Sequence, residues 1–176
     1  WNDHLSFRMG YILEIPAAPP SSYKIAEGSF TWHEAKVDAE ARGGHLATVT
    51  SDLEQDYIGD LAGSSDMHLW LGGTDEDSEG NWTWVTGETW GYDNWHTGEP
   101  SNGEELEHYL HILGKNTLHD LSGYNIGIWN DVPSSGQWSG RDNVIEGYVL
   151  EIPVTNITPP VITWATPEAI TYGDAL

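Results

Sequence analysis

The chain has 176 residues, of which 28 are acidic and only 6 are basic, so its net charge is −22. This excess of negative charge argues against binding to nucleic acids and to anionic membrane surfaces. The sequence contains no cysteine, which excludes disulfides, zinc–thiolate sites and thiol nucleophiles. No segment approaches the roughly 20 apolar residues of a membrane span. The acidity indicates a salty or extracellular setting, metal-binding acids, or both.

The two ends of the chain read as parts of neighbouring modules. Residues 1–16 carry a Trp-Asn-Asp block and a Gly-Tyr-Ile-Leu-Glu-Ile-Pro block, which return in close to the same form within residues 129–153. We therefore expect 1–16 to be the C-terminal remnant of a preceding repeat, followed by a proline-rich linker at 17–22 and a complete domain at 23–153. Residues 154–176 are predicted to be a linker and the start of another β-rich repeat.

A strand and a helix are expected at the start of the complete domain. Residues 23–30 are a strand candidate. Thr31, with Glu34 three residues later, forms the capping-box pattern of a helix that ends near Arg42.

The next elements follow the same logic. Residues 45–49 predict a short strand, and Ser51 with Glu54 predicts the start of a second helix over 52–61. The remainder reads as short strands and long polar loops, ending in an apolar strand at 148–152.

Ten tryptophans are many for this length, and five of them lie between Trp70 and Trp95. Large aromatic side chains are usually mostly buried, so we expect them to form aromatic cores beneath irregular loops. Exposed tryptophans that stack on sugars would give a similar sequence.

One region collects acceptor oxygens from carboxylates, amides and a hydroxyl. It comprises residues 98–102, then Glu107, and further along Asn130 and Asp131, with almost no basic residue nearby. Calcium takes about six to eight oxygen ligands in a tolerant geometry. The pattern therefore predicts a calcium loop that leaves coordination positions open to the hydroxyls of a ligand.

These features together resemble the C-type lectin-like domain, over essentially all of residues 22–153. The matching motifs are Trp32-His33-Glu34-Ala35, Gly43-Gly44-His45-Leu46-Ala47, Trp70-Leu71-Gly72-Gly73, Gly80-Asn81-Trp82-Thr83-Trp84, Asn94-Trp95, Gly98-Glu99-Pro100 and Trp129-Asn130-Asp131. The resemblance implies an α+β fold with two helices, two small antiparallel sheets and a long loop that carries the calcium sites. The chain would be a cysteine-free, bacterial member, and 154–176 resembles the start of a bacterial immunoglobulin-like repeat.

The resemblance also implies a set of ligands for calcium and sugar. Carried over from the sugar-binding members, they are Glu99, Ser101, Glu107, Asn130 and Asp131, with a cis peptide before Pro100. Two neighbouring sugar hydroxyls would complete the coordination of the ion, each donating to a carboxylate and accepting from an amide.

Position 101 departs from the family, which has asparagine where this chain has Ser101. Asn102 could take over as the ligand, or calcium could bind the serine through a water molecule. The family motif Glu-Pro-Asn implies mannose- or glucose-type sugars, and the serine leaves that preference open.

A second family calcium position would use Asp75, Glu79, Asn102 and His108. The family has an aspartate in place of His108, and a neutral imidazole is a poor calcium ligand. A solvated acidic turn over residues 75–80 is therefore the favoured interpretation.

Family members usually carry disulfides that this chain cannot form. Ala39 and Leu150 occupy one pair of cysteine positions, and Tyr109 and Ser134 occupy the other. Apolar packing would have to replace the first crosslink.

The sequence does not predict an enzyme. The eight histidines show no spacing typical of a nucleophile–base pair or a metal triad. A glycosidase-type pair of carboxylates cannot be told from a calcium cage in sequence, but the fold resemblance weighs against hydrolysis.

We therefore expect a calcium-dependent carbohydrate-binding module of a secreted or cell-surface protein, in which repeated modules add avidity to a weak single site. The alternative is a protein-binding adhesion or scaffold module with a structural or metal-free loop.

Overall fold

The computed structural model describes residues 21–65, 67–114, 126–137 and 145–154. In chain order its elements are β1 (Ser21–Glu27), α1 (Trp32–Ala41), β2 (His45–Leu46), α2 (Asp52–Ser65), β3 (Leu69–Thr74), β4 (Thr83–Trp84), a 3₁₀ turn (Gly103–Glu105), β5 (Tyr109–Ile112), β6 (Trp129–Val132) and β7 (Gly147–Pro153). The predicted flanking segments 1–16 and 154–176 lie outside the described residues except for Val154, as do residues 17–20 of the predicted linker. The two helices and the α+β class are confirmed.

The strands form one mixed sheet in the order β1-β7-β3-β5-β6, with β2 also paired to β7 and β4 to β3. All pairs are antiparallel except β3 and β7, which run parallel where Leu69 faces Gly147 and Trp70 faces Tyr148. The expected division into two small antiparallel sheets is therefore wrong in this detail, because the β3–β7 pairing joins the two parts.

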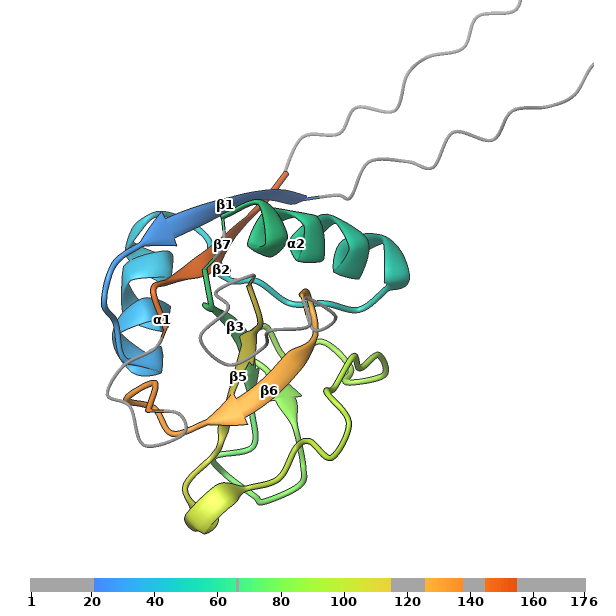
Figure 1. Ribbon diagram of the computed structural model, residues 1–176. Coiled ribbons are helices and arrows are strands. Elements are labelled where there is room, and N and C mark those ends of the chain that lie inside the picture. Colours follow the sequence, from blue (N-terminus) through green and yellow to red (C-terminus); the bar gives the residue numbers. More distant parts are fainter. Residues whose placement is uncertain (1–20, 66, 115–125, 138–144, 155–176) are drawn as a thin grey trace, which may run out of the picture.

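The ends of the domain lie together. Ser21, at the start of β1, pairs with Pro153, at the end of β7. Figure 1 shows the long loop between β4 and β5, with its 3₁₀ turn, at the opposite end of the molecule. The chain thus enters and leaves at one end and presents the predicted calcium loop at the other.

Helix α1 begins with the predicted capping box. The Glu34 N–H donates to Thr31 Oγ1 at 3.2 Å, and the Thr31 N–H donates to Glu34 Oε2 at 2.8 Å. Helix α2 begins in a similar way at Ser51 and Glu54, where the Glu54 N–H donates to Ser51 Oγ. It runs to Ser65, four residues beyond the expected end.

Replacing Thr31 by alanine is expected to lower the free energy of unfolding by about 1 kcal/mol, because the first turn of α1 loses its side-chain acceptor. Urea unfolding measures this, with Thr97→Ala at an exposed loop position as the control. Equal stabilities of the two variants would show that the box contributes nothing.

Apolar packing occupies the place of the first family disulfide. Ala39 of α1 and Leu150 of β7 are both buried in one core cluster, together with Trp70 and Tyr148. Tyr109, at a position of the second family disulfide, is buried in the same cluster.

A second buried core cluster contains Trp82, Trp84 and Trp129, and it consists largely of aromatic rings, as expected from the tryptophan content. Trp84 and Trp90 stack with ring centroids 4.3 Å apart, and Trp82 and Trp95 meet at 4.7 Å. Trp129 Nε1–H donates to the buried Gln55 Oε1 of α2 at 2.8 Å. The prediction of core use is confirmed for the five tryptophans that are at most 7% exposed, namely Trp32, Trp70, Trp82, Trp84 and Trp129.

Candidate functional site

The long loop between β4 and β5 is held against the start of β6. The Trp129 N–H donates to the Asn94 carbonyl, and the His96 N–H donates to the Trp129 carbonyl, both at 2.9 Å. The ring of Trp95 packs edge-on against Trp129, with centroids 5.7 Å apart. The Glu99 N–H then donates to the His96 carbonyl, so this attachment carries Glu99 alongside β6.

Three successive backbone N–H groups of the loop point at two carboxylates. Asp131 is 1% exposed and accepts from the N–H of Ser101 at 3.1 Å and from that of Asn102 at 2.9 Å. The N–H of Gly103 donates to Glu107 Oε2 at 2.6 Å. Asn102 has a left-handed backbone, φ 48°, which turns these amides inward. Such a concave run of amides holds anionic oxygens in place.

Glu99 adds a further carboxylate that the loop leaves unsatisfied. Its peptide bond to Pro100 is cis, as the resemblance implies. Glu99 Oε2 is buried, and no hydrogen-bond partner for it lies among the described residues. Burial raises the pKa of Asp131 to about 6, the amides of Asn102 and Ser101 oppose the rise, and the Glu99 carboxyl adds to it. The two acids therefore lie close together, and no lysine or arginine in the described part of the chain is paired with either of them.

Few positive side chains occur among the described residues. They are Lys24 in β1, Lys36 in α1 and Arg42 just after α1, and residues 43–114 contain no lysine or arginine. A buried carboxylate is costly unless it is paired with a cation. The oxygen ligands and the unsatisfied Glu99 oxygen therefore fit a hard divalent cation such as calcium.

The remaining predicted ligands lie around the same carboxylates. Ser101 Oγ–H donates to Glu107 Oε2 at 3.2 Å, and the Glu107 N–H donates to Asn102 Oδ1 at 3.3 Å. Asn130 is buried in β6, and its Nδ2–H donates to the Asp131 carbonyl at 2.8 Å. The predicted ligands thus come together from two segments. The loop supplies Glu99, Ser101, Asn102 and Glu107, and β6 supplies Asn130 and Asp131.

The acids predicted for the second position come closer together than those of the first. Within the described part of the chain, Asp75, Glu79 and His108 form the only group of three acid or imidazole side chains with ligand atoms within 4.8 Å of one another. The acids of the predicted first site do not meet this distance limit as a group of three, since Glu107 is turned toward Ser101 and the 3₁₀ turn.

One expectation for the second position needs correction. The acidic turn is solvated at its exposed residues 76–79, but Asp75 itself is only 2% exposed. Asn102 bonds to Asp131 and Glu107 of the predicted first site, and its part in the second position stays a prediction. Folding also brings His108 to two carboxylates some 30 positions earlier, a grouping that spacing along the sequence does not report.

His111 is a core histidine. It is fully buried in β5, with its ring 5.9 Å from that of His68. Burial lowers the pKa of His111 well below its usual value, so it is neutral at physiological pH.

Gly103 lies against the predicted ligand Glu107, a relation that sequence reasoning missed. A Cβ placed there would lie 2.6 Å from Glu107 Oε2. The only sequence signal was a glycine between two predicted ligands.

Replacing Gly103 by alanine is expected to push the Glu107 carboxylate away and weaken calcium binding about tenfold, as loss of an orienting contact does. Thermal stability without calcium should change little, since the clash is with the end of a flexible side chain. Titration calorimetry measures the affinity, with Gly91→Ala as the control because open space surrounds Gly91. Equal calcium affinities of the two variants would contradict the placement of Glu107.

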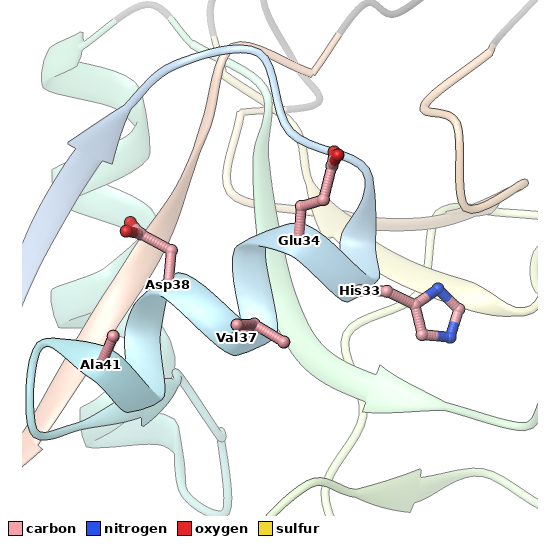
Figure 2. Close-up of a pocket in the computed structure, with 5 residues that line it drawn as sticks. All are labelled: His33, Glu34, Val37, Asp38 and Ala41. Carbon is pink, nitrogen blue, oxygen red and sulfur yellow. The ribbon is translucent and has the colours of Figure 1, made fainter.

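A separate hollow of about 430 Å³ lies on the outer face of α1, lined by His33, Glu34, Val37, Asp38 and Ala41 (Figure 2). All five residues come from one helix, and Figure 2 shows the side chains of Glu34 and His33 diverging. The hollow has no convergent polar groups of the kind that orient a ligand.

The family model described as the lectin C-type domain matches residues 28–135. The chain belongs to the C-type lectin domain family. This membership confirms the recognised fold and the expectation that the chain is not an enzyme, since the family consists of non-enzymatic carbohydrate-binding proteins. Bacterial origin and the immunoglobulin-like repeat stay predictions.

Individual relatives agree with the family. The chain is 33% identical over 93 residues to a perlucin-like protein of Mytilus galloprovincialis, covering 49% of this chain and 60% of the relative. Across three such relatives the chain spans 14% to 60% of their length.

Two solved structures share the fold. The cow carbohydrate-recognition domain of CD23, crystallised in the presence of GlcNAc2Man3 oligosaccharide, superposes with a TM-score of 0.63 at 25% identity, covering 81% of this chain and 98% of that one. A calcium-independent type II antifreeze protein superposes with a TM-score of 0.60 at 20% identity, covering 82% and 98%. The fold therefore also occurs in a calcium-independent protein, and the metal must be argued from the loop. Within the described residues, no helix is long and apolar enough to cross a membrane.

Proposed function

We propose that this chain is a calcium-dependent carbohydrate-binding module of a secreted or cell-surface protein. The observation that carries the proposal is the pair formed by buried Asp131 and partly buried Glu99. Glu99 has a buried oxygen without a hydrogen-bond partner, the pKa of Asp131 is raised, and no lysine or arginine among the described residues is paired with either acid. A divalent cation would bind the unpartnered oxygen and neutralise the two acids.

Glu99, Ser101, Glu107, Asn130 and Asp131 would hold the ion. Bound calcium supplies positive charge and open coordination positions that hydroxyl oxygens can fill. The chain's own part is to present acids beside amides, since a sugar hydroxyl can donate to a carboxylate and accept from an amide N–H. The inward-pointing amides of Ser101, Asn102 and Gly103 fix the Asp131 and Glu107 carboxylates for this task.

Mannose- or glucose-type sugars are the proposed ligands. The support is the Glu99-Pro100 motif and the similarity to a CD23 domain crystallised in the presence of a mannose-containing oligosaccharide. Ser101 keeps an oxygen directed at Glu107, although it lacks the amide that the family has there.

Single-site affinity is expected to be weak, and neighbouring modules would supply avidity. The paired ends of β1 and β7 suit this arrangement, because a module that enters and leaves at one end can be inserted in a series with its loop facing outward. The proposed repeat boundaries at residues 1–16, 17–22 and 154–176 fit the same picture.

The alternative is a protein-binding adhesion or scaffold module. It is favoured by one observation, namely that the same fold occurs in a calcium-independent protein.

Binding of the full chain to a glycan array, in calcium and in chelator, separates the two functions. We expect binding to mannose- or glucose-terminated glycans that disappears with chelator and with Glu99→Gln. Glu27→Gln, an exposed acid in β1, is the matched control and should bind like the wild type. Glycan binding that survives chelation would favour the alternative. So would a chain that binds no glycan but binds a protein ligand specifically.

A further inference from the structure

A second group of ligands lies at the junction of β3 and β5. Asp75 directly follows β3, and His108 directly precedes β5. The two strands are neighbours in the sheet, and the Asp75 N–H donates to the His108 carbonyl at 3.3 Å. The side chains then converge, with His108 Nδ1 lying 3.0 Å from Asp75 Oδ1 and 3.4 Å from Glu79 Oε2.

Asp75 is a buried and well-fixed member of this group. Its side chain is 1% exposed, and its Oδ2 accepts the N–H of Gly80 at 2.7 Å. The Ser78 N–H donates to the Asp75 carbonyl, so the loop closes around this residue. Oδ1 is thereby aimed at the imidazole, while Glu79 approaches from the exposed side.

The separations between these atoms suit a small metal ion. Two ligands that lie about 2.0–2.2 Å from one ion are about 3 to 3.5 Å from each other in tetrahedral or octahedral geometry. The pairs that involve His108 Nδ1, at 3.0 and 3.4 Å, match this spacing. An imidazole with two carboxylates suits zinc and related transition metals, whereas calcium prefers oxygen ligands alone.

The surroundings add negative charge and a second imidazole. His33 Nε2 lies 3.3 Å from Glu76 Oε2, and the rings of both His33 and His108 lie beside Tyr109. Residues 43–114 contain no lysine or arginine that could neutralise the three acids Asp75, Glu76 and Glu79. The local field therefore favours a divalent cation at the point where His108 meets the two carboxylates.

We propose that Asp75, Glu79 and His108 form a transition-metal site of the zinc type, in place of the second calcium position that the family resemblance implied. His108 stands at the end of the calcium loop, directly after Glu107, but the site uses none of the proposed calcium ligands and does not depend on the proposed function. Water would complete the coordination at the exposed side of Glu79.

Cobalt(II) titration of the full chain, followed by visible absorption, tests the proposal, because coordination by an imidazole and carboxylates gives a spectrum distinct from that of the aqueous ion. We expect one cobalt signal that zinc displaces and that millimolar calcium does not. His108→Ala and Glu79→Gln should each weaken cobalt binding at least about tenfold. His96→Ala is the matched control and should bind like the wild type. Glu99→Gln should also leave the signal unchanged, which separates this site from the calcium loop.

A second experiment tests whether His108 sets the preference of the site for a transition metal over calcium. His108→Asp creates a set of oxygen ligands alone, so its cobalt affinity should fall while a second equivalent of calcium, beyond the one bound by the loop, appears in calorimetry. Equal cobalt binding in wild type, His108→Ala and Glu79→Gln would overturn the proposal. Displacement of cobalt by an equal concentration of calcium would do the same. Glu79 is about half exposed, so Glu79→Gln keeps the test valid if His108→Ala fails to fold.

Discussion

Replacing Asp131 by asparagine is expected to abolish the stabilisation of the domain by calcium. Asp131 is 1% exposed, lies beside Glu99 and supplies negative charge to the proposed cage. At a calcium concentration one hundred times the dissociation constant, the wild type should gain about 2.7 kcal/mol of unfolding free energy. The variant should gain almost nothing, and its sugar binding should disappear with the metal.

Thermal unfolding with calcium and with chelator measures the effect as a difference within each protein. Any loss of basal stability in the variant, where one amide of the loop loses its acceptor, cancels in this difference. Asp93→Asn, an exposed acid in the loop between β4 and β5, is the control and should keep the full gain. A calcium gain in Asp131→Asn equal to that of the control would remove Asp131 from the cage.

Without calcium, the domain is expected to lose stability as the pH rises from about 4 to above 6. The pKa of Asp131 is raised from 3.8 to about 6 in the folded state. A group whose folded-state pKa is raised stabilises the fold below its unfolded pKa, and this contribution is lost as the pH rises through the folded value. A shift of about two units corresponds to about 3 kcal/mol.

Calcium is expected to reverse this trend, because it binds the deprotonated carboxylate and its stabilisation therefore grows with pH. Other acids act in the opposite sense, since hydrogen bonds lower the pKa of Glu34 and of Asp38. Urea unfolding from pH 4.5 to 7.5 should therefore compare the wild type with Asp131→Asn at each pH, in chelator and in calcium. Parallel curves for the two proteins in chelator would show that Asp131 does not titrate in this range.

Much of the fold could be predicted because its signals are local. Thr31 with Glu34 and Ser51 with Glu54 are pairs three residues apart, and both helices begin where these pairs predict. The cis peptide before Pro100 and the buried Trp129 followed from motifs that match the family residue by residue.

Long-range relations could not be read in the same way. The parallel contact of β3 with β7 joins Leu69 to Gly147, and no local pattern reports such a pairing. The convergence of His108 on Asp75 likewise depends on which strands are neighbours. The role of Gly103 depends on the direction in which the Glu107 side chain folds back, which spacing does not specify.

The central claim is that a sugar completes the coordination of calcium held at Glu99 and Asp131. Calcium affinity measured by calorimetry in the absence and presence of saturating methyl mannoside or methyl glucoside tests it most directly. Coupling between two ligands is reciprocal, so the sugar should tighten calcium binding by the same factor by which calcium tightens sugar binding. The claim would be contradicted if the sugar bound equally well in chelator and left the calcium affinity unchanged.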